Sequence, residues 1–582
     1  MRNAASDAMA GLKRGLIALG LVATTASGAS AQLLIDGTIF YENNASGTLV
    51  GQFSGTSAGP ACAGLTASTL FGTTYPHNSY QNPLLSAAVY QPNVKPNWQP
   101  APGSPAFGNA VVVPNDGFFK QTCYKGAIGG SPGMDDWTLG WTYYDSTGAN
   151  RTDIDYTKPL AIYNNISILG HRTWSPDSNY EVRGSLRIRS QASLSIPPGV
   201  VILEDVATLG TIIVHRGGSI HAIGTREAPI VITSNAGNGN MQRGDIGGIA
   251  LLGRARTNVV NSCLGDSAQS EGGAIGHYGG NDDTDGSGCL RYVRVEFAGR
   301  QITPNNELNS FTWNACGRST RADFLESFQS ADDGFELFGG DMRLTHLLAV
   351  DGTDDGFDTQ LGARAKAQFV IVRIDPRLAP AGTQFGERGL EADNNEFNFN
   401  ETQCAGRSAI QVANFTLIGD KRRGPGFGAT AAAQGAEMRR GTAYSVYNSI
   451  VYNFNGFGAR VSDQATWDAH CAAPPAAPAV FCPGAVGIES PISGGNVFVA
   501  RSAPNPFRDK VTFSFSLPQS GPVSVEIYSA DGRHIQTVAK GQMAAGPHTV
   551  SWSMDRETPS GMYFYRVLAG DQQTTGKITR VD

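Results

Sequence analysis

Apolar and polar residues alternate along the clearest part of the chain, between residues 184 and 252. Leu186 and Ile188, and likewise Leu194 and Ile196, are separated by one polar residue, as in strands that turn one face inward. The segment 184–188 recurs at 210–214, an interval that is typical of one coil of a solenoid. Further strands are predicted at residues 220–223, 228–232, 248–252, 292–297, 344–350, 369–374, 410–418 and 444–452.

Turn signals and composition favour an all-β chain. Pro197-Pro198-Gly199 and Arg216-Gly217-Gly218 supply corners between strands, and glycine makes up 72 of the 582 residues. Long helical periodicity is missing, and the spacing between coils varies with long polar inserts. We therefore predict a right-handed parallel β-helix over residues 32–465, with a cap region at its N-terminal side.

A short acidic phrase is repeated at about the interval of one coil. Asp332-Asp333-Gly334 recurs as Asp354-Asp355-Gly356, with every matching position at the same offset. A weaker third copy follows at 387–391, where an insert within the coil would keep the column in register. Neighbouring coils lie about 4.8 Å apart, so stacking concentrates negative charge and favours a bound cation or shared protons.

The C-terminal part has a different character. An Ala/Pro-rich linker is predicted over residues 466–495. Beyond it, residues 496–582 contain alternating strands such as 511–517, frequent turn signals between the strands, and no cysteine. This pattern predicts a small immunoglobulin-like β-sandwich.

The N-terminus predicts export. Basic residues precede an apolar stretch at 15–23, and Ala29-Ser30-Ala31 offers a cleavage site, so residues 1–31 are interpreted as a secretory signal peptide. That stretch is too short to span a bilayer, and no later segment is long enough. Its removal takes three basic residues from 44 and one acidic residue from 50, leaving 41 Lys and Arg against 49 Asp and Glu. A net charge of −8 argues against a nucleic-acid partner.

Eight cysteines in an exported chain suggest disulfides. Because neighbours along a solenoid are also neighbours in space, we expect pairing in chain order. The expected pairs are Cys62 with Cys123, Cys263 with Cys289, Cys316 with Cys404, and Cys471 with Cys482.

Several phrases occur in an order that resembles one known group. It comprises exported β-helix proteins common in Bacteroidetes and related phyla, whose activities are largely unassigned. The resemblance implies the fold and an address outside the cell, but no catalytic residues. The phrases are 196–200, 210–218, 228–234, 247–253, 290–294, both Asp-Asp-Gly-Phe motifs, 391–394 and 438–442.

A second resemblance covers the C-terminus. The phrases at 504–507, 523–528, 531–533 and 559–565 resemble the type A sorting domain of type IX secretion. The segment is also similar to the immunoglobulin-like domain of flagellar-hook capping proteins. The resemblance implies export by Sec and then a type IX-like route, with secretion machinery of the outer membrane as partner. A permanent accessory module is the alternative.

The acidic column is the first candidate site. Stacked carboxylates suit Ca²⁺, which takes several oxygen ligands in irregular geometry. In a polysaccharide lyase of this fold, Ca²⁺ would acidify a uronate α-proton and Arg388 or Arg440 would stand near it. In a hydrolase, two carboxylates would act as acid and base, and in the simplest alternative the Asp-Gly pairs only form corners. The predicted ligands are Asp332, Asp333, Asp354 and Asp355, with Glu336, Asp358 and Glu391 in the adjacent column.

Two further constellations are candidates. Asp283 and Asp285 lie in a loop that approaches a calcium-binding pattern but lacks its first Asp and its final Glu. A polar loop without a cation is the alternative. The aromatic cluster Trp137, Trp141, Tyr143 and Tyr144 can stack on sugars, or it can cap or pack the β-helix instead.

Two functions of different classes follow. The preferred one is a non-enzymatic secreted or cell-surface β-helix that binds polysaccharide or adheres to cells, stiffened by disulfides and Ca²⁺. The alternative is a Ca²⁺-dependent polysaccharide lyase or glycoside hydrolase with its site on the acidic column. A lyase requires a free basic residue and an open groove at that column, whereas a structural ion is enclosed.

Overall fold

A computed structural model describes the chain outside the predicted signal peptide, with several gaps. The chain divides into two compact units, residues 1–481 and 482–582. The described residues are 33–43, 47–86, 96–129, 136–146, 154–260, 262–263, 267–270, 275–303, 306–374, 388–421, 433–472, 476–482, 500–503, 507–517, 520–529, 533–544, 546–553, 559–569 and 572–580.

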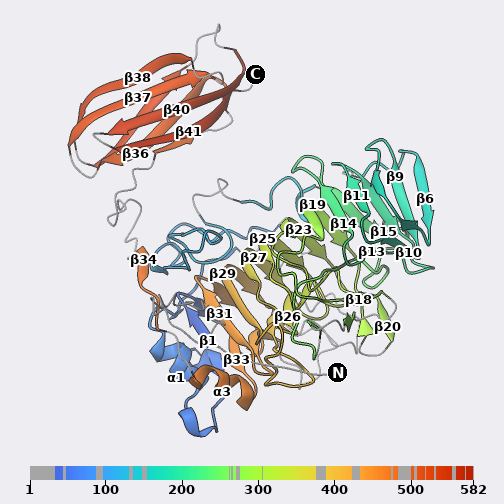
Figure 1. The fold of residues 1–582 in the computed structure, drawn as a ribbon. Coiled ribbons are helices and arrows are strands. Elements are labelled where there is room, and N and C mark those ends of the chain that lie inside the picture. The colour runs from blue at the N-terminus through green and yellow to red at the C-terminus, as the bar shows by residue number, and fades with distance from the viewer. Residues whose placement is uncertain are drawn as a thin grey trace, which may run out of the picture. The chain divides into compact units, whose positions relative to one another are not determined.

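The first unit is a parallel β-helix, which confirms the predicted architecture (Figure 1). One coil starts at β24 (Phe335–Phe338), continues through β25 (Arg343–Val350) with a bend at His346, and returns through the second Asp-Asp-Gly turn to β26 (Phe357–Gln360). Phe335 pairs with Phe357 in parallel register, and both follow an Asp-Asp-Gly phrase directly. The repeat in the sequence is therefore one coil of the solenoid.

In the described residues, three parallel sheets line the β-helix. The largest has seventeen strands within this part of the chain. They are β1 (Leu33–Asp36), β2 (Ile39–Tyr41), β4 (Ser79–Tyr80), β6 (Leu160–Asn164), β8 (His171–Thr173), β9 (Asn179–Arg183), β11 (Ser193–Ile196), β12 (Val201–Glu204), β14 (Ser219–Ile223), β15 (Ile230–Ser234), β19 (Gly288–Glu296), β23 (Arg321–Phe328), β25, β27 (Lys366–Arg373), β29 (Ala409–Ile418), β31 (Ala443–Tyr447) and β32 (Ile450–Tyr452). The second sheet comprises β7 (Ser167–Ile168), β10 (Ser185–Ile188), β13 (Thr211–Val214), β16 (Ile249–Leu252), β22 (Phe311–Asn314), β24 and β26. The third comprises β28 (Arg388–Ala392), β30 (Gln434–Met438), β33 (Ala459–Val461) and β3 (Phe53–Ser54).

Short two-stranded sheets and helical segments lie outside the three large sheets. The two-stranded sheets are β17 (Ala268–Gln269) with β18 (His277–Tyr278), β20 (Gln301–Thr303) with β21 (Asn306–Glu307), and β5 (Ala110–Val111) with β34 (Val480–Cys482). The helical segments are η1 (Val50–Gln52), η2 (Pro60–Cys62), α1 (Ala67–Thr69), η3 (Leu70–Thr74), α2 (Tyr143–Ser146) and α3 (Gln464–Ala472).

The bends within the long strands place side chains in a stacked column. Tyr292, Phe324, His346 and Phe369 all have positive φ, a left-handed conformation that is costly for residues other than glycine. Their rings stack at centroid distances of 4.5 Å, 4.2 Å and 5.1 Å along the series. Stacking between coils offsets the local backbone cost.

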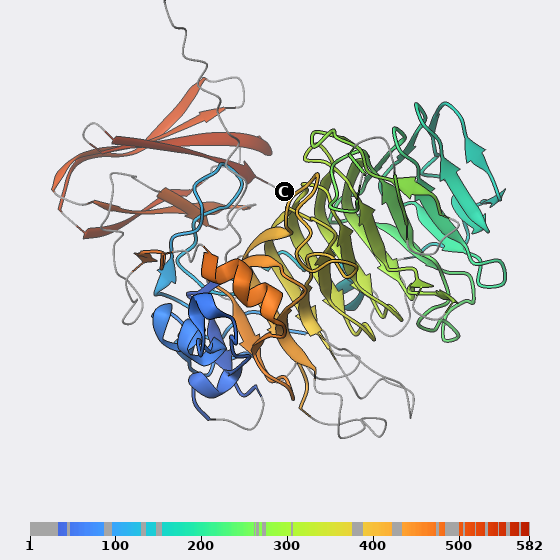
Figure 2. The same cartoon turned by 60° about the horizontal axis from the view of Figure 1, so that its bottom comes forward.

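The N-terminal segment completes the far end of the β-helix instead of capping its first coil. β1 pairs with β31, β2 with β32, and β3 with β33. Helices α1 and α3 lie at this end (Figure 2). Phe71 and Trp467 are buried there. Part of the predicted linker is thus folded, because Trp467 anchors α3 and β34 pairs with β5.

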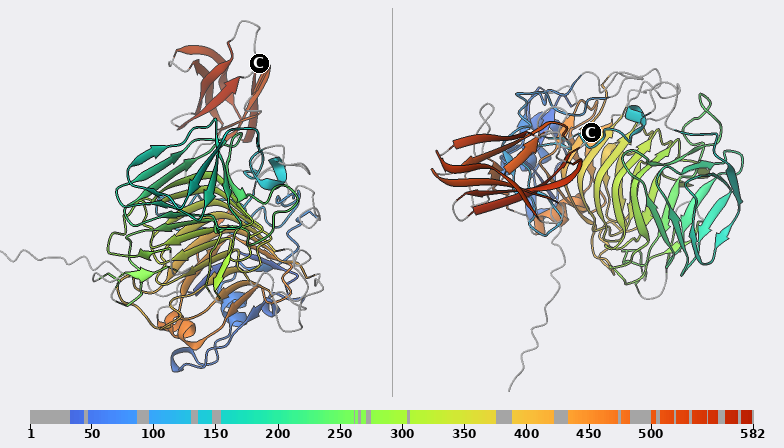
Figure 3. Two further views of the ribbon diagram at one scale, coloured as in Figure 1. Left: turned by 90° about the vertical axis from the view of Figure 1, so that its right-hand side faces the viewer. Right: turned by 90° about the horizontal axis from the view of Figure 1, so that it is seen from above.

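The described part of the second unit forms two antiparallel sheets, drawn in orange and red in Figure 3. In several of its strands, every second residue points into a buried core, which includes Phe513, Val525 and Val567. This agrees with the predicted β-sandwich. One sheet has β35 (Ala500–Ala503), β36 (Lys510–Leu517) and β39 (Gly546–Ser553). The other has β38 (His534–Met543), β37 (Gly521–Ser529), β40 (Gly561–Ala569) and β41 (Gln572–Arg580).

Candidate functional site

The two Asp-Asp-Gly turns stack at one corner of the β-helix. Asp333 Oδ1 accepts a hydrogen bond of 2.8 Å from the backbone N–H of Asp355 in the next coil. Asn309 Oδ1 accepts one of 3.1 Å from the N–H of Asp333. The side chain in each coil thus caps the backbone of the following one, which is the corner role that the sequence left open as the simplest alternative.

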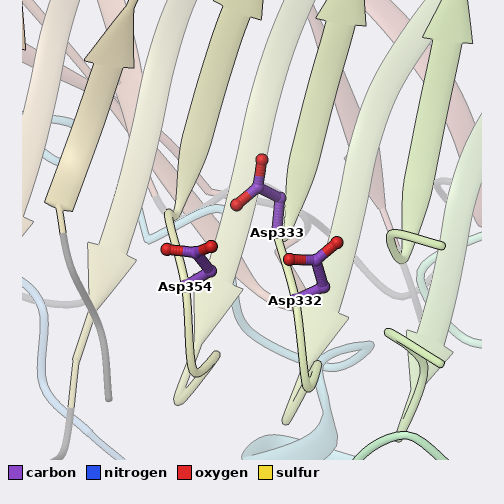
Figure 4. Close-up of side chains that lie close together, drawn as sticks. All are labelled: Asp332, Asp333 and Asp354. Carbon is purple, nitrogen blue, oxygen red and sulfur yellow. The ribbon is translucent and has the colours of Figure 1, made fainter. Parts of the chain in front are cut away.

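The same corner brings carboxylates together as a potential metal site. Oxygen atoms of Asp332, Asp333 and Asp354 lie within 4.8 Å of one another (Figure 4). Asp333 is buried, whereas Asp332 and Asp354 are half-buried. Asp333 also groups with Glu336 and Asp358, both buried, within the same distance. Two overlapping acidic clusters therefore share one carboxylate.

Burial and like charge favour protonation of these groups. Burial, followed by the neighbouring Asp332 and Glu336, raises the pKa of Asp333 well above its usual range. Burial and the charge of Glu391 do the same for the pKa of Asp355, and burial with the charge of Asp393 raises the pKa of Asp358 to about 6. A protein binds either protons or a cation at such a site, and Ca²⁺ accepts this set of oxygen ligands.

The adjacent acidic column runs along the second and third sheets. Glu336 pairs in register with Asp358, and Glu391 with Glu437. Arg388 N–H groups reach Glu391 at 2.8 Å, Glu437 at 2.5 Å and Asp355 at 3.5 Å. Burial opposes the charge, but these three carboxylates raise the pKa of Arg388 far above its ordinary value. Arg388 is consequently a fixed counter-ion in this structure.

The structure adds Arg439 and Glu437, which the sequence reasoning missed, and it places Arg440, an expected basic residue, beside Asp393. Arg439 binds Asp393 at 2.7 Å and also contacts Glu391, and Arg440 binds Asp393 at 2.7 Å. Glu437 holds Arg388 from the next coil, on β30. These residues carry no Asp-Asp-Gly signal. No strand is predicted from the sequence at residues 434–438, so Glu437 had no signal there.

Comparison with protein families assigns both units. Residues 166–474 match the pectate-lyase like beta helix domain. The chain belongs to this family. Residues 503–580 match a secretion system C-terminal sorting domain. No curated protein and no solved structure matches the chain.

The sorting domain indicates secretion to the cell surface or the extracellular space and implies an interaction with the secretion machinery. Among the described residues, no helix is long and apolar enough to cross a membrane. The predicted location outside the cell is confirmed by the sorting domain. The signal peptide itself lies outside the described residues.

In this pectate-lyase-like β-helix, the second predicted calcium loop is tied to arginines. Asp283 accepts hydrogen bonds from Arg256 at 2.5 Å and Arg364 at 2.7 Å. Asp285 accepts one from Arg254 at 2.8 Å. Guanidinium groups thus take the carboxylate oxygens that a cation would need. A calcium role for this loop stays a prediction without geometric support.

The Asp283 ion pairs predict a loss of stability in acid. Burial opposes the charge, but hydrogen bonds from Arg364 and Arg256 lower the pKa of Asp283 to about 2. The stabilisation is therefore present above the unfolded-state pKa near 4 and is lost as the pH falls through about 2. A shift of this size corresponds to about 2 kcal/mol. Urea unfolding at several pH values should show the difference between wild type and Asp283→Asn shrinking by this amount in acid, whereas a constant difference would contradict the assignment.

The aromatic cluster covers the side of the β-helix. Trp141 and Trp137 are buried against the stacked column, with Trp141 at 5.5 Å from Tyr292. Tyr143 stacks on Phe328 at 3.7 Å, and Tyr144 OH accepts a hydrogen bond from Arg373 at 2.8 Å. The buried rings favour the packing alternative over stacking on sugars, and their ligand-binding role stays a prediction.

The predicted cysteine pairing is wrong. Cys62 is bonded to Cys471 and Cys263 to Cys404, while Cys289 and Cys316 are free thiols. Cys123 is also disulfide-bonded, and the side chain of Cys482 lies outside the described residues. Pairing in chain order failed for two reasons. Residues 33–54 join the last coils, and the segment that carries Cys404 lies against residues 257–258 of an earlier coil.

Proposed function

We propose that this secreted β-helix binds acidic polysaccharide through Ca²⁺ held at Asp332, Asp333 and Asp354, without cleaving it. The convergence of these three carboxylates within 4.8 Å carries the proposal. Asp332 and Asp354 are each only half-buried, so part of the cluster is exposed to solvent. When bound, Ca²⁺ would supply coordination positions for carboxylate groups of a uronate polymer.

The electrostatics of the column support binding over catalysis. A lyase needs a basic group that can accept a proton, but Arg388 is paired with Asp355, Glu391 and Glu437. Its raised pKa keeps it protonated. The acidic residues at the Asp-Asp-Gly corner attract a cation, while the arginines further along neutralise Glu391 and Asp393.

The test is Ca²⁺-dependent retention of a soluble acidic polysaccharide, polygalacturonate, by the full mature chain. Wild type should bind Ca²⁺ in calorimetry after chelator treatment and should retain the polymer only with Ca²⁺. The double variant Asp332→Asn, Asp354→Asn should bind Ca²⁺ at least tenfold more weakly, which is about 1.4 kcal/mol. Glu227→Gln, at an exposed acid on the loop between β14 and β15, is the matched control and should behave as wild type.

Two results would contradict the proposal. Equal Ca²⁺ binding by wild type and the double variant would remove the cation from this corner. Unsaturated uronate absorbance on incubation with the polymer would establish a lyase instead, and the loss of this absorbance in the double variant would then place the catalytic site here.

A further inference from the structure

The first coil of the β-helix has an open edge. β6, β7 and β8 form this coil and pair with β9, β10 and β11 of the next one. In the part of the chain that the structure describes, these strands have no pairing along their other edge. Figure 1 shows β6 at the end of the solenoid opposite α1 and α3. A row of backbone N–H and C=O groups on each strand is therefore available to another chain.

Large apolar side chains surround this edge. Leu160 is 47% exposed, Ile162 52%, Ile166 41% and Leu169 78%. All four lie in the short stretch 160–169 of the same coil. Single exposed apolar residues are ordinary on a protein surface, but a group of this size around unpaired strands marks an interaction site.

Most of the edge lacks the usual protection against association. Residues 160–170, which include β6 and β7, contain no charged residue and no proline, the two devices that commonly blunt an edge strand, whereas β8 carries the exposed Arg172. The interior of the coil is plugged, because Trp174 stacks on Tyr180 at 3.9 Å and donates a hydrogen bond of 3.1 Å to Tyr163 OH. The end is therefore a solid face with an open strand rim, and a partner would lie on it without entering a cavity.

The opposite end of the same β-helix is closed. β1, β2 and β3 complete its last coils, and the disulfide Cys62–Cys471 ties η2 to α3 over them. Head-to-tail stacking of copies would need that end to be open. The described part of the β-helix therefore offers no second open edge that could receive the first coil of another copy. The first coils of two copies can instead pair with each other through a two-fold axis.

We propose that two copies of this chain stack head to head through their first coils. Their strand edges have the same outline, so each supplies the hydrogen-bond partners and apolar contacts that the other lacks. Charged groups of both signs lie near the rim, with Asp155 and Asp177 beside Lys158 and Arg172 in the sequence, and Arg189 donates a hydrogen bond of 3.1 Å to Ser167 of the first coil. The dimer presents its two acidic corners on separate β-helices and is independent of the proposed calcium function.

The test is the mass of the full mature chain by light scattering at micromolar concentration. Wild type should have the mass of a dimer, twice that of one chain. Ile162→Lys and Leu169→Lys should each have the mass of a monomer. Phe397→Lys is the matched control, because this phenylalanine is 80% exposed on a loop in a distant coil, and it should keep two chain masses. Thermal melting of each variant checks that the fold persists.

Hydrogen exchange provides a readout that needs no variant. The β6 amides should be protected in concentrated wild type and should exchange on dilution, whereas those of β12 should be protected in both states. A single chain mass for wild type would overturn the proposal. So would two chain masses for both lysine variants, or β6 exchange that does not change with concentration.

Discussion

Replacing Arg388 with glutamine is expected to lower the free energy of unfolding by about 3–5 kcal/mol, because it leaves several buried carboxylates without their counter-ion. The Arg388 side chain is only 15% exposed and reaches Asp355, Glu391 and Glu437 together. Those carboxylates come from three different coils. The variant therefore loosens the stack, and the effect extends beyond one strand.

Urea unfolding at neutral pH measures this loss. The matched control is Arg318→Gln, whose guanidinium is 52% exposed and pairs with Asp341 at 2.9 Å, and it should cost less than about 1 kcal/mol. The cost of Arg388→Gln should shrink as the pH is lowered, since protonation removes the unpaired negative charge of Glu391 and Asp355. A similar loss of unfolding free energy in the two variants would contradict the prediction, because it would mean that the buried carboxylates do not depend on Arg388 as their counter-ion.

Removal of the disulfide Cys62–Cys471 by serine substitution at both positions is expected to cost about 2–5 kcal/mol. The bond joins positions that are 409 apart in the sequence and fastens the N-terminal strands to α3. In the variant without this disulfide, β1, β2 and β3 are held to the last coils by strand pairing, packing and side-chain hydrogen bonds such as that from Leu33 N–H to His470 Nδ1. We therefore expect faster hydrogen exchange in β1 than in β12 of the variant.

The second disulfide offers a matched comparison. Cys263–Cys404 closes a shorter loop, with a sequence separation of 141. Loop-closure entropy alone predicts that its removal costs about 1 kcal/mol less than removal of Cys62–Cys471. Comparison of both double-serine variants by urea unfolding checks this order. The reverse order, or no loss for Cys62→Ser with Cys471→Ser, would show that the N-terminal coil is secured without its disulfide.

The repeated patterns determined much of the β-helix from the sequence alone. The offset between the segments 184–188 and 210–214 is the register of β10 against β13. The offset between the two acidic phrases is likewise the register of β24 against β26. The third copy of the acidic phrase, at 387–391, also stacks on the second, because the N–H of Gly356 donates to the carbonyl of Arg388 at 3.1 Å. In a solenoid each coil contacts its neighbour, so a local period contains the tertiary contact.

Contacts between distant segments were decided only by the tertiary structure. No period relates β1 to β31, so the closure of the far end and the Cys62–Cys471 bond had no signal in the sequence. The same holds for Trp141, for which the sequence left stacking on sugars and packing of the β-helix as alternatives, and whose burial against Tyr292 is a long-range contact. The sequence by itself determined the coils, the stacked Asp-Asp-Gly corners and the secretion address. Which carboxylates have arginine partners, and which end of the β-helix stays open, depend on long-range packing that a local pattern does not encode.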